Sequence, residues 1–398
     1  MTIRKPSLHR TLRTQRGYAL IGIIAAVGIA ATTVLVTSLS TTAINNEQER
    51  KTNAALALAK LALIGRAAAD GNRPGSLPCP DIDNDGVLTL NVDYGSGGNC
   101  TSTIGRLPWR TLDLPDLRDA SGERLWYAVS PNFRDVDTNI INSNTLGQIY
   151  VSGNITASNA AAIVFAPGAQ LDSQPRDSAH QNTISSFLEQ PYIEKLVFTS
   201  QAAGDSFNDR LMVIEPADIF AIVQRRVAKE VQDALNVYFN QPPYTETVST
   251  TTMVDGNPVT TTTTTTKTSG RYPFAASAGN SNCLAGGNSA ACVSVQDLMT
   301  GLIPGTPDAV NDFPPYSGTA TLLGAGSAAW FEANGWREVV SYTVSPECAT
   351  NSPAPCASGS INITVNTTTL TNQKATLLFT GVPGRDDQRL KTTLLTGV

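Results

Sequence analysis

The sequence predicts an α+β fold in which a long N-terminal membrane-spanning helix carries two tandem heads, each a helix packed on a small antiparallel sheet. Three observations lead to this prediction. Residues 15–36 form an apolar run that continues without proline to residue 69. The rest of the chain contains an internal repeat of strand-like segments. The second copy of that repeat follows an amphipathic segment that begins at Pro216.

The apolar run at 15–36 follows five basic residues and no acidic one, and the next charge is Glu47. More than 20 apolar residues, at a rise of 1.5 Å each, are long enough to cross a hydrocarbon core of about 30 Å. The basic flank predicts a cytoplasmic N-terminus and a single pass through the membrane, with the rest of the chain on the outer side. Residues 43–69 are rich in good helix formers. We therefore expect one helix of about 50 residues, roughly 75–80 Å long.

The border between the charged and the apolar residues reads "RGYALI" at 16–21. This junction resembles the cleavage site of type IV prepilins and type II secretion pseudopilins, in which a basic leader ends in Gly. The resemblance implies that a prepilin peptidase cuts after Gly17 and that Tyr18 becomes a methylated N-terminus. It divides the segment into a leader over 1–17 and a transmembrane and stalk helix over 18–70. An uncleaved membrane anchor is the alternative interpretation.

One family position differs in this chain. The glutamate found at the fifth mature position of the family is replaced here by Gly22. In the family that glutamate is thought to pair with the N-terminus of a neighbouring subunit, and its absence is typical of the minor subunit at a filament tip. The resemblance therefore implies a minor subunit that crosses the bacterial inner membrane once, with its heads in the periplasm. It also implies that this subunit contacts other pilins or pseudopilins through its N-terminal helix and reaches the filament tip or cell surface.

The internal repeat defines two further domains, a first head over 71–200 and a second over 215–398. Four short motifs recur in the same order with nearly constant offsets. Pro78 and Pro273 are 195 residues apart, and Tyr127 and Tyr342 are 215 apart. The repeated segments are β-branched and aromatic and are bounded by turn residues, which is typical of strands. The segment from Pro216 has apolar residues at helical spacing, so each head has a helix of its own.

A threonine-rich insertion near 245–268 interrupts the second head. Asp255-Gly256 lies between two runs of β-prone residues, which predicts a long hairpin. A disordered, glycosylated threonine-rich loop is the alternative.

The six cysteines form three pairs that are close in sequence. An even number of cysteines in an exported protein predicts disulfides. The expected pairs are Cys79–Cys100, Cys283–Cys292 and Cys348–Cys356. None has CxxC spacing, so a zinc site is not expected.

A structural calcium site is predicted in the first head. Asp81, Asp83 and Asp85 precede Gly86, which matches the opening of a calcium loop in which alternate carboxylates converge on one hard cation. The twelfth position of the loop is not Glu, and Asp93 is the candidate that replaces it at a shifted position. The alternative is a polar turn with solvated charges.

The composition excludes several functions. A net charge of −5 offers no basic face to nucleic acid. The chain has two histidines and no nucleophile elbow, phosphate loop or zinc-type cluster, so it is not expected to be an enzyme. The charged segment 106–124 is interpreted as a salt-bridged scaffold around Trp109 and Trp126. The predicted function is a non-enzymatic minor pilin or pseudopilin that primes or caps a type IV pilus or a type II secretion pseudopilus. The alternative is an adhesin-like binding protein displayed on a pilus.

Overall fold

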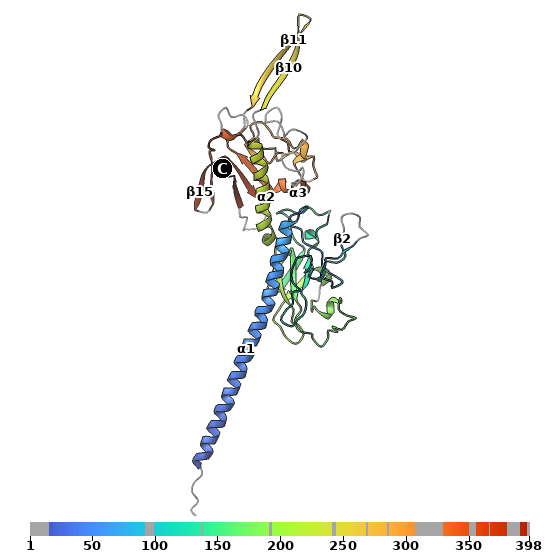
Figure 1. The fold of residues 1–398 in the computed structure, drawn as a ribbon, viewed down its shortest axis with the longest axis vertical. Helices are drawn as coiled ribbons and strands as arrows, with labels where there is room; N and C mark the ends of the chain where they lie inside the picture. The colour runs from blue at the N-terminus through green and yellow to red at the C-terminus, as the bar shows by residue number, and fades with distance from the viewer. Residues whose placement is uncertain are drawn as a thin grey trace, which may run out of the picture. The chain divides into compact units, whose positions relative to one another are not determined.

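The structure is a computed structural model, shown in Figure 1. It describes residues 16–91, 99–136, 138–190, 193–240, 244–267, 270–284, 286–306, 329–349, 356–365, 367–379 and 391–395. The surroundings of side chains are described from Thr42 onward, with a few further gaps. Within these residues the chain is mostly small sheets, with three α-helices.

Helix α1 spans Arg16–Ala69. Within the described residues, no helix is apolar over a length sufficient to cross a membrane. The predicted membrane-spanning helix, and with it the single pass through the inner membrane and the periplasmic location of the heads, is contradicted by this finding. Where the side chains of α1 are described, the helix carries exposed charges from Glu47 to Lys51, and charged groups are costly in hydrocarbon. The apolar run at 15–36 lies outside the residues whose side chains are described.

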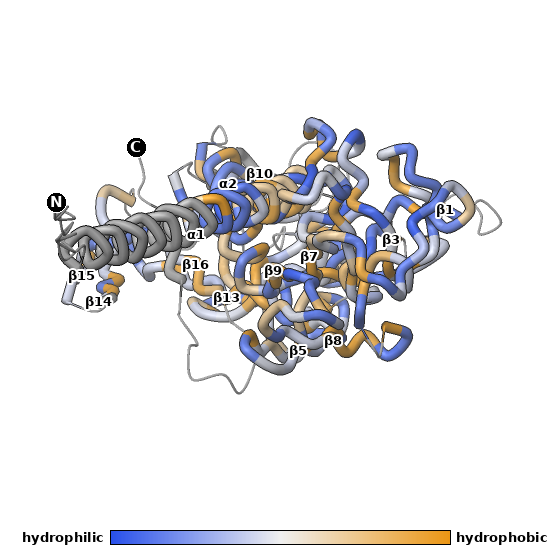
Figure 2. The backbone as a smooth tube through the Cα atoms, turned by 90° about the horizontal axis from the view of Figure 1, so that it is seen from below, coloured by the Kyte–Doolittle hydropathy of each residue, from blue (hydrophilic) through white to orange (hydrophobic). Residues whose placement is uncertain are grey.

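Two four-stranded antiparallel sheets have equivalent strand orders, β3-β4-β7-β9 and β12-β13-β16-β17. The first comprises β3 (Ile104–Arg106), β4 (Trp126–Val129), β7 (Ala162–Ala166) and β9 (Arg210–Ile214). The second comprises β12 (Thr300–Leu302), β13 (Val340–Val344), β16 (Ala375–Phe379) and β17 (Lys391–Leu395). In both sheets the two central strands, β4 with β7 and β13 with β16, are adjacent and antiparallel. Figure 2 shows apolar stretches around β7 and β13.

The last part of α1 and the first part of α2 (Pro216–Phe239) lie side by side and run in the same direction. Lys60 of α1 binds the carboxylate of Asp218 at 2.7 Å, near the start of α2. About two turns further along α2, Arg226 donates to the carbonyl oxygens of Ala68 and Asp70 at the end of α1, at 2.9 and 2.6 Å. These contacts join the two helices at both ends of the shared segment. The third helix, α3, is short and spans Ala329–Ala333.

A single hydrophobic core joins the two sheets and the two long helices. It contains Leu63 of α1, Tyr127 of β4, Phe220 of α2 and Tyr342 of β13, all buried. The chain from Ala55 to Val398 accordingly forms one compact unit, and residues 1–54 form another. The predicted fold class, with two tandem heads on a membrane-spanning helix, is therefore wrong. Each helix was expected to cover its own sheet, but their apolar faces are buried in a common core.

Four smaller sheets complete the described part of the chain. Strands β5 (Ile149–Gly153), β6 (Ala157–Ala160) and β8 (Val197–Ser200) form a three-stranded sheet in which β5 and β8 are parallel. Its buried side chains share a second hydrophobic core with side chains of the first four-stranded sheet, among them Trp126 and Phe165. Three hairpins pair β1 (Leu90–Asn91) with β2 (Asn99–Cys100), β10 (Tyr244–Val254) with β11 (Asn257–Lys267), and β14 (Ile361–Val365) with β15 (Thr368–Gln373). The 3-10 helices are η2 (Pro131–Phe133), η3 (Ile184–Ser186), η4 (Ile193–Lys195), η5 (Ser281–Cys283), η6 (Ser289–Ala291), η8 (Trp336–Val339) and η9 (Pro346–Cys348).

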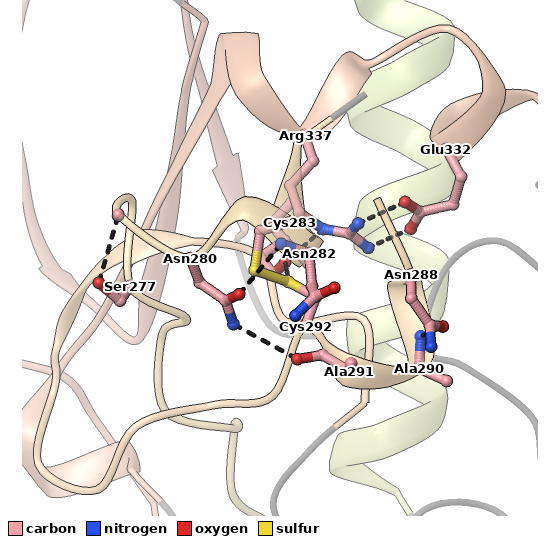
Figure 3. Close-up of a disulfide and its surroundings, with 12 residues drawn as sticks. Ser277, Asn280, Asn282, Cys283, Asn288, Ala290, Ala291, Cys292, Glu332 and Arg337 are labelled. Atoms are coloured by element: carbon pink, nitrogen blue, oxygen red, sulfur yellow. Dashed lines mark hydrogen bonds and ion pairs between the residues drawn. A yellow bond between two sulfur atoms is a disulfide. The ribbon is translucent and has the colours of Figure 1, made fainter. Parts of the chain in front are cut away.

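The six cysteines form three disulfides between the pairs that are close in sequence. The Cys283–Cys292 bond is drawn in Figure 3. Beside it, the side chain of Asn280 accepts from the amide of Asn282 at 3.0 Å and donates to the carbonyl oxygen of Ala291 at 3.3 Å. The bond to Ala291 connects the segment before Cys283 with the end of the loop that the disulfide closes, so a side-chain contact joins the two segments as well as the covalent bond.

Candidate metal centre

Three aspartates in the loop after Pro80 bring their carboxylates together. One oxygen from each of Asp81, Asp83 and Asp85 lies within 4.8 Å of the other two. The loop is attached to the first sheet on one side, because the backbones of Asp81 and Arg106 exchange two hydrogen bonds of 3.0 and 2.7 Å. The Cys79–Cys100 disulfide ties the same segment to β2. The sequence-predicted cluster is thus assembled on a fixed base.

The carboxylate of Asp81 organises the turn. Its Oδ1 accepts from the amides of Asp83 and Asn84 at 3.1 and 2.7 Å, and its Oδ2 accepts from the amide of Gly86 at 2.7 Å. The turn needs glycine at its end, where Gly86 has φ +90°. A Cβ at this position would lie 2.6 Å from the indole Nε1 of Trp109. Gly86 therefore allows both the bend and the close packing on the indole.

The charged segment predicted as a scaffold supports this loop from outside. Arg124 donates to both the carbonyl and the side-chain oxygen of Asn84, each at 2.8 Å. The guanidinium of Arg124 also binds Asp116, with a shortest contact of 2.9 Å, and lies 5.8 Å from the ring centre of Trp109. These contacts hold the middle of the loop, so the three carboxylates are positioned by groups that are not themselves candidate ligands.

The electrostatics of the cluster disfavour three negative charges. Burial raises the pKa of Asp81, and the nearby carboxylate of Asp83 raises it further, whereas the amides of Gly86 and Asn84 act in the opposite direction. Asp83 and Asp85 extend toward solvent, since both are exposed. A cation between the three groups would offset the desolvation and the repulsion together. The donors, all carboxylate oxygens, are those that Ca²⁺ prefers.

The other predicted site residues are placed as follows. Asp93, the shifted fourth ligand, lies outside the described residues. Gly17 and Tyr18 lie in the first turn of α1, but their side chains are outside the described part of the chain. The cysteines of the three disulfides are buried.

Sequence reasoning missed a pair of carboxyl groups outside this loop, Glu189 and Asp209. Asp209 is buried, and its Oδ2 accepts from the amide of Glu189 at 2.8 Å. The carboxylate of Glu189 in turn accepts from the amides of Asn208 and Asp209 at 2.9 and 3.1 Å. No sequence signal marks this pair, because the two carboxyls meet only through tertiary packing.

Comparison of the chain with protein-family models, with curated proteins and with solved structures gave no match.

Proposed function

We propose that the chain is a non-enzymatic minor pilin-like subunit that primes or caps the filament of a type IV pilus or a type II secretion pseudopilus. The observation that carries the proposal is the construction of α1. It is one helix of 54 residues in which Ala55, Leu56, Ala59 and Leu63 are buried, whereas the described residues 42–51 are exposed. The helix is therefore packed in the core from Ala55 onward, and its exposed residues 42–51 offer a surface to helices of other subunits.

The residues at the start of α1 support the same proposal. The junction of Gly17 and Tyr18 resembles the processing site of prepilins, and Gly22 stands where the family has its pairing glutamate. The proposed partners are a prepilin peptidase and other pilin-like subunits. In this proposal the charged residues of Glu47–Lys51 lie along the filament beside helices of other subunits. They therefore do not have to enter hydrocarbon.

A photo-cross-linking experiment tests the proposal in cells that produce the full chain. A photoreactive amino acid at Asn46, on the exposed part of α1, is expected to cross-link to another pilin-like subunit. The same amino acid at Ser173, which is exposed on a loop of the compact unit, serves as the matched control and is expected to give no such product. Mass spectrometry identifies the adducts. Absence of a pilin-like partner at Asn46, or equal capture at both positions, would contradict the proposal.

The exposed hairpin β10–β11 favours the second candidate function, an adhesin-like protein displayed on a pilus. The two functions differ in what loss of the chain does. Cells that lack a priming subunit are expected to lose filaments. Cells that lack a displayed adhesin are expected to keep filaments in normal number and to lose attachment to a surface. Counting filaments by electron microscopy in the deletion strain separates the two.

We also propose that the loop at 81–86 binds calcium as a structural ion. The support is the convergence of three carboxylates on a loop that is fixed by Arg124 and by the Cys79–Cys100 disulfide. A native-state ligand stabilises by RT ln(1 + [L]/Kd), or about 2.7 kcal/mol at a hundredfold excess over Kd. Ca²⁺ is therefore expected to raise the melting temperature of the full chain relative to the chelator EGTA.

The variant Asp83→Ala with Asp85→Ala is expected to lose this calcium-dependent shift. A matched control replaces two exposed aspartates elsewhere, Asp172→Ala with Asp205→Ala, and is expected to keep the shift. Differential scanning calorimetry measures all three proteins with calcium and with EGTA. If the wild-type melting temperature is the same in both, or if the shift survives in the first double variant, the loop is only a polar turn.

A further inference from the structure

The hairpin of β10 and β11 is a ribbon with two open edges. Its strands pair over 11 rungs, from Tyr244 with Lys267 to Val254 with Asn257. Among the described residues neither strand pairs with a third, as Figure 1 also shows. A two-stranded hairpin alone is marginally stable in water. Each outer edge presents unpaired backbone N–H and C=O groups, which form a template for another strand.

The sequence of the ribbon does not protect these edges. Charged side chains and proline are the usual protection, yet the charges of Tyr244–Lys267 are confined to Glu246, Asp255 and Lys267. Strand β11 has no charged residue between Asn257 and its last residue, Lys267. Its proline, Pro258, is the second residue of the strand and lies next to the turn. Most of the edge is therefore uncharged and able to donate.

The ribbon already contains the side-chain pairing that a second copy would reproduce. On one face, Ser249 and Thr262 lie across from each other with their hydroxyls 3.1 Å apart, and Thr251 and Thr260 with theirs 2.9 Å apart. Cross-strand hydroxyl pairs of this kind stabilise a sheet. Since residues 260–266 are all threonine, pairing β11 with another β11 places threonine opposite threonine across its centre.

We propose that the outer edge of β11 pairs with the same edge of a second copy of this chain, which gives a four-stranded antiparallel sheet in the order β10-β11-β11-β10. A two-fold axis through the middle of the strand places Thr262 opposite Thr262 of the second copy. The same register places Lys267 opposite Asn257 of the second copy, two residues from its Asp255. Residues of opposite charge are thus close in register at both ends of the new pair, whereas pairing through β10 does not bring Glu246 near a basic residue. The inference is independent of the proposed filament role.

A pair of charge variants tests this geometry on the full chain. In the proposed sheet, the Cβ atoms of the two Thr262→Lys residues lie about 5 Å apart, and like charges placed directly opposite each other destabilise the pairing. Sedimentation velocity over a concentration series is expected to show self-association of the wild type that this variant weakens about fivefold. Ser249→Lys is the matched control, because it adds the same charge to the same rung. Its two copies lie three strand spacings apart, about 14 Å, so association is expected to stay within about twofold of wild type.

Mixing supplies the decisive result. Thr262→Glu alone is expected to associate weakly, and an equimolar mixture with Thr262→Lys is expected to return to wild-type association or above it. Association through α1 is common to all variants and leaves these differences unchanged. The proposal is overturned if the wild type does not associate, if Ser249→Lys weakens association as much as Thr262→Lys does, or if the mixture does not recover. Far-UV circular dichroism verifies that each variant is folded.

Discussion

Phe220→Ala is expected to lower the free energy of unfolding by about 3–5 kcal/mol, the usual cost of removing a buried phenylalanine side chain. Phe220 lies on α2 and is 4% exposed. Its ring centre is 5.9 Å from that of Phe133, in the first half of the repeat, and 6.0 Å from that of Trp336, in the second half. The cavity would therefore open between the two halves of the repeat.

The position of Phe220 also predicts where protection is lost. In a single core, amide hydrogen exchange is expected to accelerate in both β4–β7 and β13–β16, while the disulfides remain intact. Ile222→Ala, two residues along the same helix, removes an exposed side chain (47%) and is expected to change stability by less than about 0.5 kcal/mol. Exchange that accelerates in one sheet only would support two independent heads and contradict the common core.

The repeat in the sequence predicted the two equivalent sheets better than it predicted their assembly. Motifs around Tyr127 and Tyr342 recur because each tyrosine is buried on a central strand of a four-stranded sheet. Alternation and β-propensity are local, so strands of this kind are visible in one sequence. The choice of which apolar faces meet is not local. The helix from Pro216 has an apolar face, but nothing in its pattern indicates that this face contacts α1 as well as both sheets.

In the candidate metal site, too, the local pattern could be predicted from the sequence and the tertiary contacts could not. The spacing of Asp81, Asp83 and Asp85 is a local pattern, and the loop that it predicts is present. Its attachment to Arg124 spans 40 residues and could not be read from the spacing. The membrane-spanning prediction relied on the length of the apolar run, on its basic flank and on the resemblance of the junction at Gly17.

The buried pair of Glu189 and Asp209 gives the second large prediction, a loss of stability as the pH rises from about 4 to about 8. Burial, and next the charge of Glu189, raise the pKa of Asp209 to about 8. Asp209 is 4% exposed, and its Oδ1 is buried without a hydrogen-bond partner among the described residues. The protonated form suits this environment, because it carries no charge into a site that another carboxyl already occupies.

The sign follows from the two end states. The unfolded chain releases the Asp209 proton near pH 4, its ordinary pKa, and the folded chain releases it near 8. Between these values the native state holds one more proton, so its stability falls as the pH rises, by up to about 1.4 kcal/mol per pH unit. The stabilisation from this group is complete below about pH 4 and is lost by the time the pH passes 8. From pH 5 to 8 the loss reaches about 4 kcal/mol.

Asp209→Asn is expected to remove this dependence. The amide has the shape of the protonated acid and cannot ionise, and its oxygen can still accept from the amide of Glu189 and from the side chain of Gln190. Urea unfolding of both proteins at pH 5 and pH 8 measures the effect. The free energy of unfolding of the variant, relative to that of the wild type, is expected to be larger at pH 8 than at pH 5 by several kcal/mol, on the order of the loss above. Asp205→Asn, an exposed change in the same segment, is expected to follow the wild type at both values. Every other titrating group is common to the three proteins, so equal pH dependence in Asp209→Asn and the wild type would show that the Asp209 carboxyl is ionised in the folded chain at neutral pH.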